Sequence, residues 1–132
     1  MIQRILVIDD DVFTRLIIAR TFTRLGYAVV ETSTAMDVPD LVREGDLGCV
    51  FLGLDLPDAD GMILLSALKQ SHPALPIVLV TSHLTDKISL EAHTRGALCC
   101  LQKPISSRTL ERLLAAVPRQ TETAVYGIGH DL

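Results

Sequence analysis

The most constraining feature of the sequence is a fivefold alternation between short apolar runs and longer amphipathic stretches. The runs hold about five residues each and lack the apolar–polar alternation of a strand with one wet face. Strands that are apolar on both faces belong in a covered sheet, and a helix between successive strands makes them parallel. The expected strands are residues 4–8, 27–30, 48–52, 77–80 and 97–101.

The stretches between these runs predict helices that cross over on both faces of the sheet. The expected helices are residues 12–25, 35–44, 62–71, 84–95 and 106–117. In the first of them, the stripe that faces the sheet is expected to hold Phe13, Leu16, Ile17, Ala19, Arg20 and Phe22. In the last, it is expected to hold Leu110, Leu113, Leu114 and Val117. The pattern predicts an α/β fold, a doubly wound five-stranded parallel sheet.

The 132 residues fit one domain of ordinary size, which we place at residues 1–118. Residues 119–132 are polar and then glycine-containing, and they indicate a linker or tail that leads toward a downstream segment. Within this tail, the stretch around His130 resembles the phospho-accepting helix of sensor histidine kinases over six residues.

Charge and hydropathy exclude several classes of protein. A net charge of −4 argues against nucleic-acid binding by this domain, which would need a basic stripe. No apolar run approaches the roughly 20 residues of a membrane span, and acidic residues follow the first apolar run too closely for a signal peptide. Three cysteines without metal-ligand spacing fit the reducing cytoplasm, where we expect the protein.

Polar residues follow four of the expected strands. They are Asp9, Asp10 and Asp11, then Asp55, Thr81 and finally Lys103. Because the carboxyl ends of parallel strands meet at one edge, these side chains are expected to converge there. Paired carboxylates suit magnesium, and a hydroxyl and a lysine beside the ion suit a phosphoryl group. The alternative is a solvated acidic loop with an Asp–Lys ion pair.

Four motifs at these strand ends resemble the receiver domain of two-component response regulators. The motifs are ILVIDDD at 5–11, LPDADG at 56–61, VTS at 80–82 and QKP at 102–104. The resemblance spans residues 1–118 and implies a flavodoxin-like sheet of order 2-1-3-4-5. It implies that Asp9 and Asp10 hold magnesium, and that Thr81 and Lys103 contact the phosphoryl group.

The phospho-acceptor position departs from the pattern of the receiver family. The resemblance places the acceptor Asp four residues before Pro57, where this chain has Gly53. Glycine cannot form an acyl phosphate, so we expect no phosphorylation at the usual position. We also expect weak magnesium binding, with Lys103 neutralising Asp9 and Asp10 directly.

A second departure concerns the aromatic switch residue that the family carries three residues before the lysine. That position holds Cys100. A thiol cannot rotate as a ring does between buried and exposed states, so we interpret Cys99 and Cys100 as small apolar residues. A redox role for the cysteines is a third-ranked alternative.

The sequence therefore predicts a regulatory module, not an enzyme, that signals through protein contacts. The expected partners are a histidine kinase or an output domain, and a second copy through the fourth helix, fifth strand and fifth helix. Arg108, Glu111 and Arg112 would lie on that charged surface. The first alternative is a phosphotransfer-competent receiver that uses Asp55 as acceptor, or Asp10 as a substitute nucleophile.

The second alternative is a phosphatase that resembles the haloacid-dehalogenase type. The matching residues would be Asp9, Asp11, Thr81 and Lys103. Such an enzyme also needs an acidic motif after the lysine to bind magnesium. Only Glu111 and Glu122 precede Asp131 in that stretch, and neither ends an expected strand.

Overall fold

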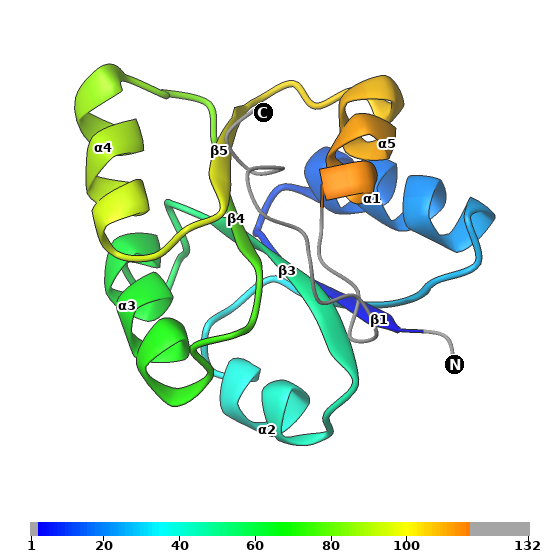
Figure 1. The fold of residues 1–132 in the computed structure, drawn as a ribbon, viewed down its shortest axis with the longest axis horizontal. Coiled ribbons are helices and arrows are strands. Elements are labelled where there is room, and N and C mark those ends of the chain that lie inside the picture. The colour runs from blue at the N-terminus through cyan, green and yellow to red at the C-terminus, as the bar shows by residue number, and fades with distance from the viewer. Residues whose placement is uncertain (1–2, 117–132) are drawn as a thin grey trace.

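A computed structural model describes residues 3–116 and confirms the predicted α/β fold (Figure 1). The strands are β1 (Arg4–Ile8), β2 (Ala28–Thr32), β3 (Leu47–Gly53), β4 (Ile77–Thr81) and β5 (Cys99–Gln102). The helices are α1 (Val12–Arg24), α2 (Val38–Arg43), α3 (Gly61–Ser71), α4 (Asp86–Thr94) and α5 (Ser107–Ala116). All strands pair in parallel in the order β2-β1-β3-β4-β5, as the resemblance implied. The predicted tail, with Glu122, His130 and Asp131, lies outside the described residues, as does Val117.

The sheet separates two apolar cores, with α1 and α5 on one face and α2, α3 and α4 on the other (Figure 1). Successive residues of a strand point to opposite faces, so Ile5 and Val7 join the α1–α5 core while Leu6 and Ile8 join the other. Residues 5–8 of the strand are thereby all buried. This two-sided burial is the reason that the apolar runs show no alternation.

The predicted stripe of α1 is confirmed in part: Phe22 is buried and Ile17 packs against the core, but the buried face is turned away from Phe13 and Leu16. Thr14, Ile18, Thr21 and Phe22 are the residues of α1 that are buried. Phe13 is 79% exposed and Leu16 is 44% exposed. Apolar residues occupy most sides of this helix, so the pattern alone left the inward face undetermined. The buried Thr14 and Thr21 were not part of the predicted stripe. In α5 the prediction is confirmed, because Leu110 and Leu113 are buried.

Helix boundaries follow the local capping chemistry. Asp11, Asp60 and Thr85 accept a hydrogen bond at the start of α1, α3 and α4 from the backbone N–H of Phe13, Met62 and Ile88. The helix predicted from residue 35 begins at Val38, which puts Pro39 in its first turn, where no N–H is needed. The helix predicted from residue 84 begins at Asp86, directly after its Thr85 cap. No helix within residues 3–116 combines the length and apolar character needed to cross a bilayer.

Candidate functional site

The carboxyl edge of the sheet holds a buried ion pair between β1 and β5. Asp9 follows β1 and is 2% exposed, and its Oδ1 lies 3.0 Å from Nζ of Lys103, which follows β5. The backbone N–H of Asp11 donates to the same Oδ1 at 2.9 Å. The other oxygen, Oδ2, is buried and has no hydrogen-bond partner among the described residues. The predicted convergence of Asp9 and Lys103 is confirmed, and one carboxylate oxygen is left unsatisfied.

The acidic partners of Lys103 differ from the expectation. Lys103 Nζ lies 3.8 Å from Oδ2 of Asp11, whereas Asp10 is exposed and forms no ion pair with Lys103. The reason is the turn into α1, because Asp11 is held there as the N-cap by Thr14 Oγ1, at 2.7 Å, and by the N–H of Phe13, at 3.0 Å. The hydrogen bond from Thr14 lowers the pKa of Asp11, with a smaller contribution from Lys103. The lysine thus neutralises Asp9 and Asp11, not Asp9 and Asp10.

Gly53 ends β3 directly beside Asp9. A Cβ at residue 53 would lie 2.9 Å from Asp9 Oδ2, 3.1 Å from Asp9 Cγ and 3.2 Å from the carbonyl oxygen of Ile8. The backbone of Gly53 does not have the positive φ that favours glycine, in contrast to Gly26. The Asp9 carboxylate therefore lies where a side chain on residue 53 would begin.

Gly61 shows what a structurally required glycine looks like in the same region. A Cβ at residue 61 would lie 2.7 Å from Leu54 Cα and would also overlap the carbonyl oxygen of Gly53. These contacts are with backbone atoms, which cannot move away by changing a side-chain rotamer. Packing α3 against the end of β3 thus requires glycine at 61, whereas the neighbour of Gly53 is mainly the movable end of a side chain.

Thr81 ends β4 and is 2% exposed. Its Oγ1 accepts a hydrogen bond from the N–H of His83 at 3.1 Å, and its carbonyl accepts one from the N–H of Lys103 at 2.8 Å. The side chain is thus bonded to the β4–α4 loop and makes no hydrogen bond to Asp9 or Lys103. Asp55 lies in the exposed turn after β3, where its backbone forms a bridge with Asp60.

The three cysteines are free thiols, and Cys49 is fully buried. Burial raises the pKa of Cys49 to about 12 and that of Cys99 to about 12, and it also raises the pKa of Cys100. Because the thiolate is the reactive form, these environments disfavour redox chemistry near neutral pH. Small apolar residues remain the better interpretation.

The residues at the sheet edge offer few ligands to a metal ion. Within residues 3–116, no group of three His, Cys, Asp or Glu side chains is placed to hold one. The unsatisfied Oδ2 of Asp9 is a suitable oxygen donor, and exposed Asp10 is the carboxylate that follows it in sequence. Magnesium prefers several oxygen ligands, and Lys103 already supplies one positive charge to Asp9.

Two residues that sequence reasoning missed bind the loops around this edge. Asp58 accepts hydrogen bonds from the N–H of Ala35 at 2.8 Å and of Met36 at 3.0 Å, which joins the β3–α3 loop to the β2–α2 loop. Gln102 bonds to two backbone groups of the β4–α4 loop. Neither partnership has a sequence signal, because each joins segments that are far apart in the chain.

Of the two acidic residues that the phosphatase alternative could use, Glu111 is not at the sheet edge, and Glu122 lies outside the described residues. Glu111 lies on α5 and forms an ion pair with Arg24 of α1, with 3.4 Å between Oε2 and Nη2. It therefore links two helices at the surface.

Comparison with known proteins identifies the family. The response regulator receiver domain matches residues 5–115, which is most of the chain. The chain belongs to this family. Receiver domains act in two-component signal transduction and are regulatory.

The relatives are longer proteins. The DNA-binding transcriptional regulator NtrC of Proteus hauseri is 29% identical over 113 residues, which is 86% of this chain and 23% of that protein. The transcriptional regulatory protein SrrA of Staphylococcus aureus is 27% identical over 123 residues, 93% of this chain and 51% of that protein. The chain therefore spans about a quarter of the length of one relative and about half of the length of the other.

Solved structures show the same fold. The receiver domain of NtrX from Brucella abortus has a TM-score of 0.79 at 28% identity, covering 86% of this chain and 96% of that one. A response regulator from Clostridium difficile has a TM-score of 0.84 at 22% identity, covering 92% and 99%.

Proposed function

We propose that this receiver domain is a signalling module that does not accept a phosphoryl group at the usual position and acts through protein contacts. The observation that carries the proposal is Gly53. The resemblance puts the acceptor at residue 53, at the end of β3. A side chain there would start within contact of Asp9, so the position faces the acidic edge and carries no nucleophile.

The charges around Gly53 support the proposal. Lys103 would contact the phosphoryl group in a competent receiver, and here its ammonium lies 3.0 Å from Asp9. The Thr81 hydroxyl, which would also contact the phosphoryl group, bonds to the backbone of its own loop. Both groups thus have protein partners that a phosphoryl group would have to displace.

Magnesium binding is expected to be weak for the same reason. Asp9 and Asp10 are the residues that would hold the ion, and the carboxylate of an acceptor is missing from the set. Fewer charged oxygen ligands mean lower affinity, and Lys103 repels a cation that approaches Asp9. We expect a dissociation constant in the millimolar range, measured by calorimetric titration of the folded domain. A micromolar value would contradict this part of the proposal.

Mass spectrometry after treatment with acetyl phosphate and magnesium tests the main proposal. The intact mass is expected to stay unchanged, whereas a receiver with an acceptor Asp, treated in parallel, gains one phosphoryl group. A magnesium-dependent adduct that maps to Asp55 or Asp10 would refute the proposal and establish the phosphotransfer alternative.

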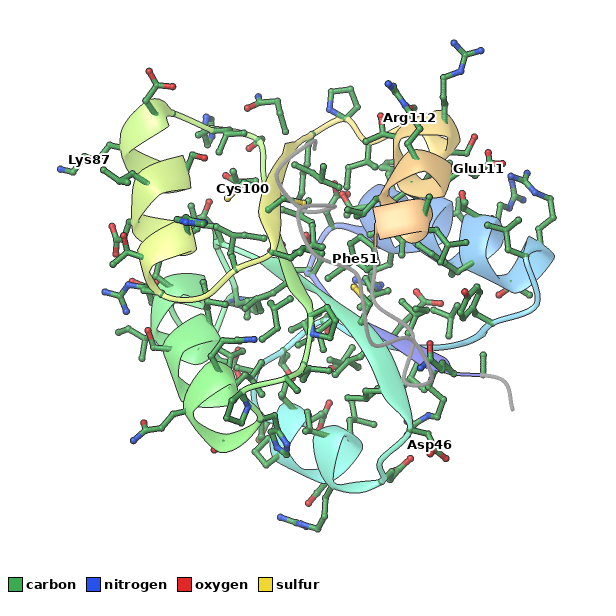
Figure 2. All side chains as sticks on the ribbon, viewed as in Figure 1. Asp46, Phe51, Lys87, Cys100, Glu111 and Arg112 are labelled. Atoms are coloured by element: carbon green, nitrogen blue, oxygen red, sulfur yellow. The ribbon has the colours of Figure 1, made fainter. Side chains whose placement is uncertain are left out.

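The surface of α4, β5 and α5 is the proposed contact face for a kinase, an output domain or a second copy. A groove of about 700 Å³ lies between these elements, and its lining includes Leu90, His93, Cys100 and Arg112. Cys100 lies on β5 and Arg112 on α5 (Figure 2). Leu90 is 67% exposed, which is high for a large apolar residue beside a groove.

A charge on Leu90 tests the second-copy version of this face. Leu90→Glu is expected to abolish concentration-dependent self-association in sedimentation velocity. Ile63→Glu is the matched control, because Ile63 is 64% exposed and lies on α3, outside the lining of the groove. Equal losses in both variants, or a wild-type protein that stays monomeric, would remove the homodimer from the proposal.

A further inference from the structure

The β4–α4 loop is held by side chains, not by backbone pairing. Gln102, the last residue of β5, accepts a hydrogen bond at Oε1 from the N–H of Leu84, at 2.9 Å. Its Nε2 donates to the carbonyl oxygen of Ser82 at 2.8 Å. Thr81 accepts from the N–H of His83 between these two positions. The first three residues of the loop, Ser82, His83 and Leu84, are thus each bonded to a side chain from a strand end.

The loop determines where α4 begins, because Thr85 caps the helix one residue after Leu84. The helix itself has little apolar anchoring. Ala92 is its one buried residue, and Ile88 is half-buried. A helix with so small a buried face is positioned by its polar contacts to a greater extent than a core helix such as α3.

The far end of α4 is also held by a side chain. Arg95, the C-cap, donates from Nη1 to Ser66 Oγ at 2.9 Å and to the carbonyl oxygen of Met62 at 3.3 Å, both on α3. Its Nε lies 3.1 Å from Glu91 Oε2. With α4 fixed to α3 at this end, Gln102 supplies the corresponding contact at the other.

We propose that Gln102 is a positioning residue whose carboxamide fixes the β4–α4 loop and the start of α4 in one position. None of its bonds involves Asp9, Lys103 or a bound group. The position that Gln102 gives the loop is therefore set without reference to the state of the acidic edge. Of the three loop bonds described above, only the bond between the Thr81 hydroxyl and His83 involves a residue of that edge, and it stays in place as long as no phosphoryl group binds. This last step rests on the proposed function, whereas the positioning itself does not.

Amide hydrogen exchange measured by NMR tests the positioning role. Gln102 is exposed, so Gln102→Ala leaves the core intact. Loss of one net hydrogen bond should speed exchange of the Leu84 amide by roughly two- to twelve-fold, while amides of β4 keep their rates. Gln102→Glu retains the acceptor for Leu84 and loses the donor to Ser82, so its Leu84 amide should exchange more slowly than in Gln102→Ala. Gln70→Ala is the control, since Gln70 is exposed on α3 and its side chain forms no hydrogen bond among residues 3–116.

Relaxation dispersion on the same samples measures the position of α4. Exchange on the microsecond-to-millisecond timescale should appear in residues 82–94 of Gln102→Ala and be absent from the wild type and from Gln70→Ala. If Leu84 exchange and α4 dispersion in Gln102→Ala match those of Gln70→Ala, the positioning role is refuted.

Treatment of the wild type with acetyl phosphate and magnesium separates this inference from the proposed function. Unchanged resonances of residues 82–94 are expected. A mass adduct with unchanged loop resonances would refute the proposed function and leave the positioning role standing. Shifted loop resonances without an adduct would refute the independence of the loop and leave the proposed function standing. An adduct together with shifted loop resonances would refute the proposed function and the independence of the loop.

Discussion

Restoring a carboxylate at residue 53 tests how the acidic edge is built. In Gly53→Ala, the new Cβ would lie 2.9 Å from Asp9 Oδ2, which is too close for a van der Waals contact. The Asp9 carboxylate therefore has to move away by a few tenths of an ångström. Overpacking costs about 1–3 kcal/mol, and the low end applies because the neighbour is the end of a side chain. The lower entropy of the unfolded alanine chain offsets about 0.4–1 kcal/mol of this. Gly53→Ala should therefore be close to wild type in stability.

Gly53→Asp adds a charge to the same steric change, and Gly53→Asn has nearly the same shape without the charge. Two carboxylates about 5 Å apart repel by about 3 kcal/mol at an effective dielectric constant of about 20. Attraction to Lys103 offsets part of this repulsion, which leaves about 1–2 kcal/mol. Without magnesium, the Asp variant should thus unfold several degrees below the Asn variant, since 1 kcal/mol shifts the melting temperature of such a domain by about 4 °C.

Magnesium should reverse the order of the two melting temperatures, so that Gly53→Asp unfolds above Gly53→Asn. With the third carboxylate present, an ion at about 100 times its dissociation constant would add about 2.7 kcal/mol to the stability of Gly53→Asp. The assay is thermal unfolding of the wild type and the three variants with EDTA and with millimolar magnesium. A large magnesium-dependent rise is expected in Gly53→Asp, and at most a small one in the wild type and the other two variants. If Gly53→Asp and Gly53→Asn respond equally to magnesium, residue 53 does not share a cation with Asp9, and the assignment of the acceptor position is wrong.

Three further outcomes are expected. Lys103→Met should lower the free energy of unfolding, measured by urea titration, by about 3 kcal/mol, because it leaves buried Asp9 without its counter-charge. A loss below about 0.5 kcal/mol would contradict the pairing. Asp58→Ala should cost about 1–2 kcal/mol in the same titration, and Asp58→Asn should cost less, since its amide oxygen still accepts one of the two loop N–H groups. Equal losses in the two variants would show that the bond retained by Asn contributes nothing. Iodoacetamide at pH 8 should alkylate Cys49 and Cys99 far more slowly in the folded protein than in urea. The reason is that a thiol of pKa about 12 is ionised in about one molecule in ten thousand at this pH. Equal rates would refute the raised pKa values.

The sequence predicts the fold well because burial on both faces leaves a strong signature. Each strand of the sheet was expected within two residues of its observed start, and β1 has the expected bounds. The rotation of α1 was not predictable in the same way. Its buried face contains Thr14 and Thr21, whereas Phe13 is exposed, so hydropathy placed Phe22 correctly and these three residues wrongly.

The site could be predicted only where it depends on strand ends. Topology brings Asp9 and Lys103 to one edge, and the ion pair between them follows from that placement. The choice of Asp11 over Asp10 as second partner depends on the turn into α1, where capping fixes the Asp11 side chain. The contacts of Gln102 depend on the conformation of a loop 18–20 residues earlier in the chain, for which the sequence offers no periodicity.

The presence of Asp9 and Lys103 in a receiver domain does not by itself indicate phosphoryl transfer. Asp9 is almost fully buried, and a buried carboxylate without a counter-charge is strongly destabilising. Lys103 neutralises it, and the Asp11 N–H bonds to the same oxygen. The pair therefore stabilises the fold whether or not residue 53 carries a nucleophile. Residue 53 is the position at this edge that distinguishes a structural role from phosphoryl transfer. Glycine there is not required by the backbone conformation, and its contacts with backbone are less close than those at Gly61. The identity of residue 53 therefore bears on the chemistry of the edge more than on its fold.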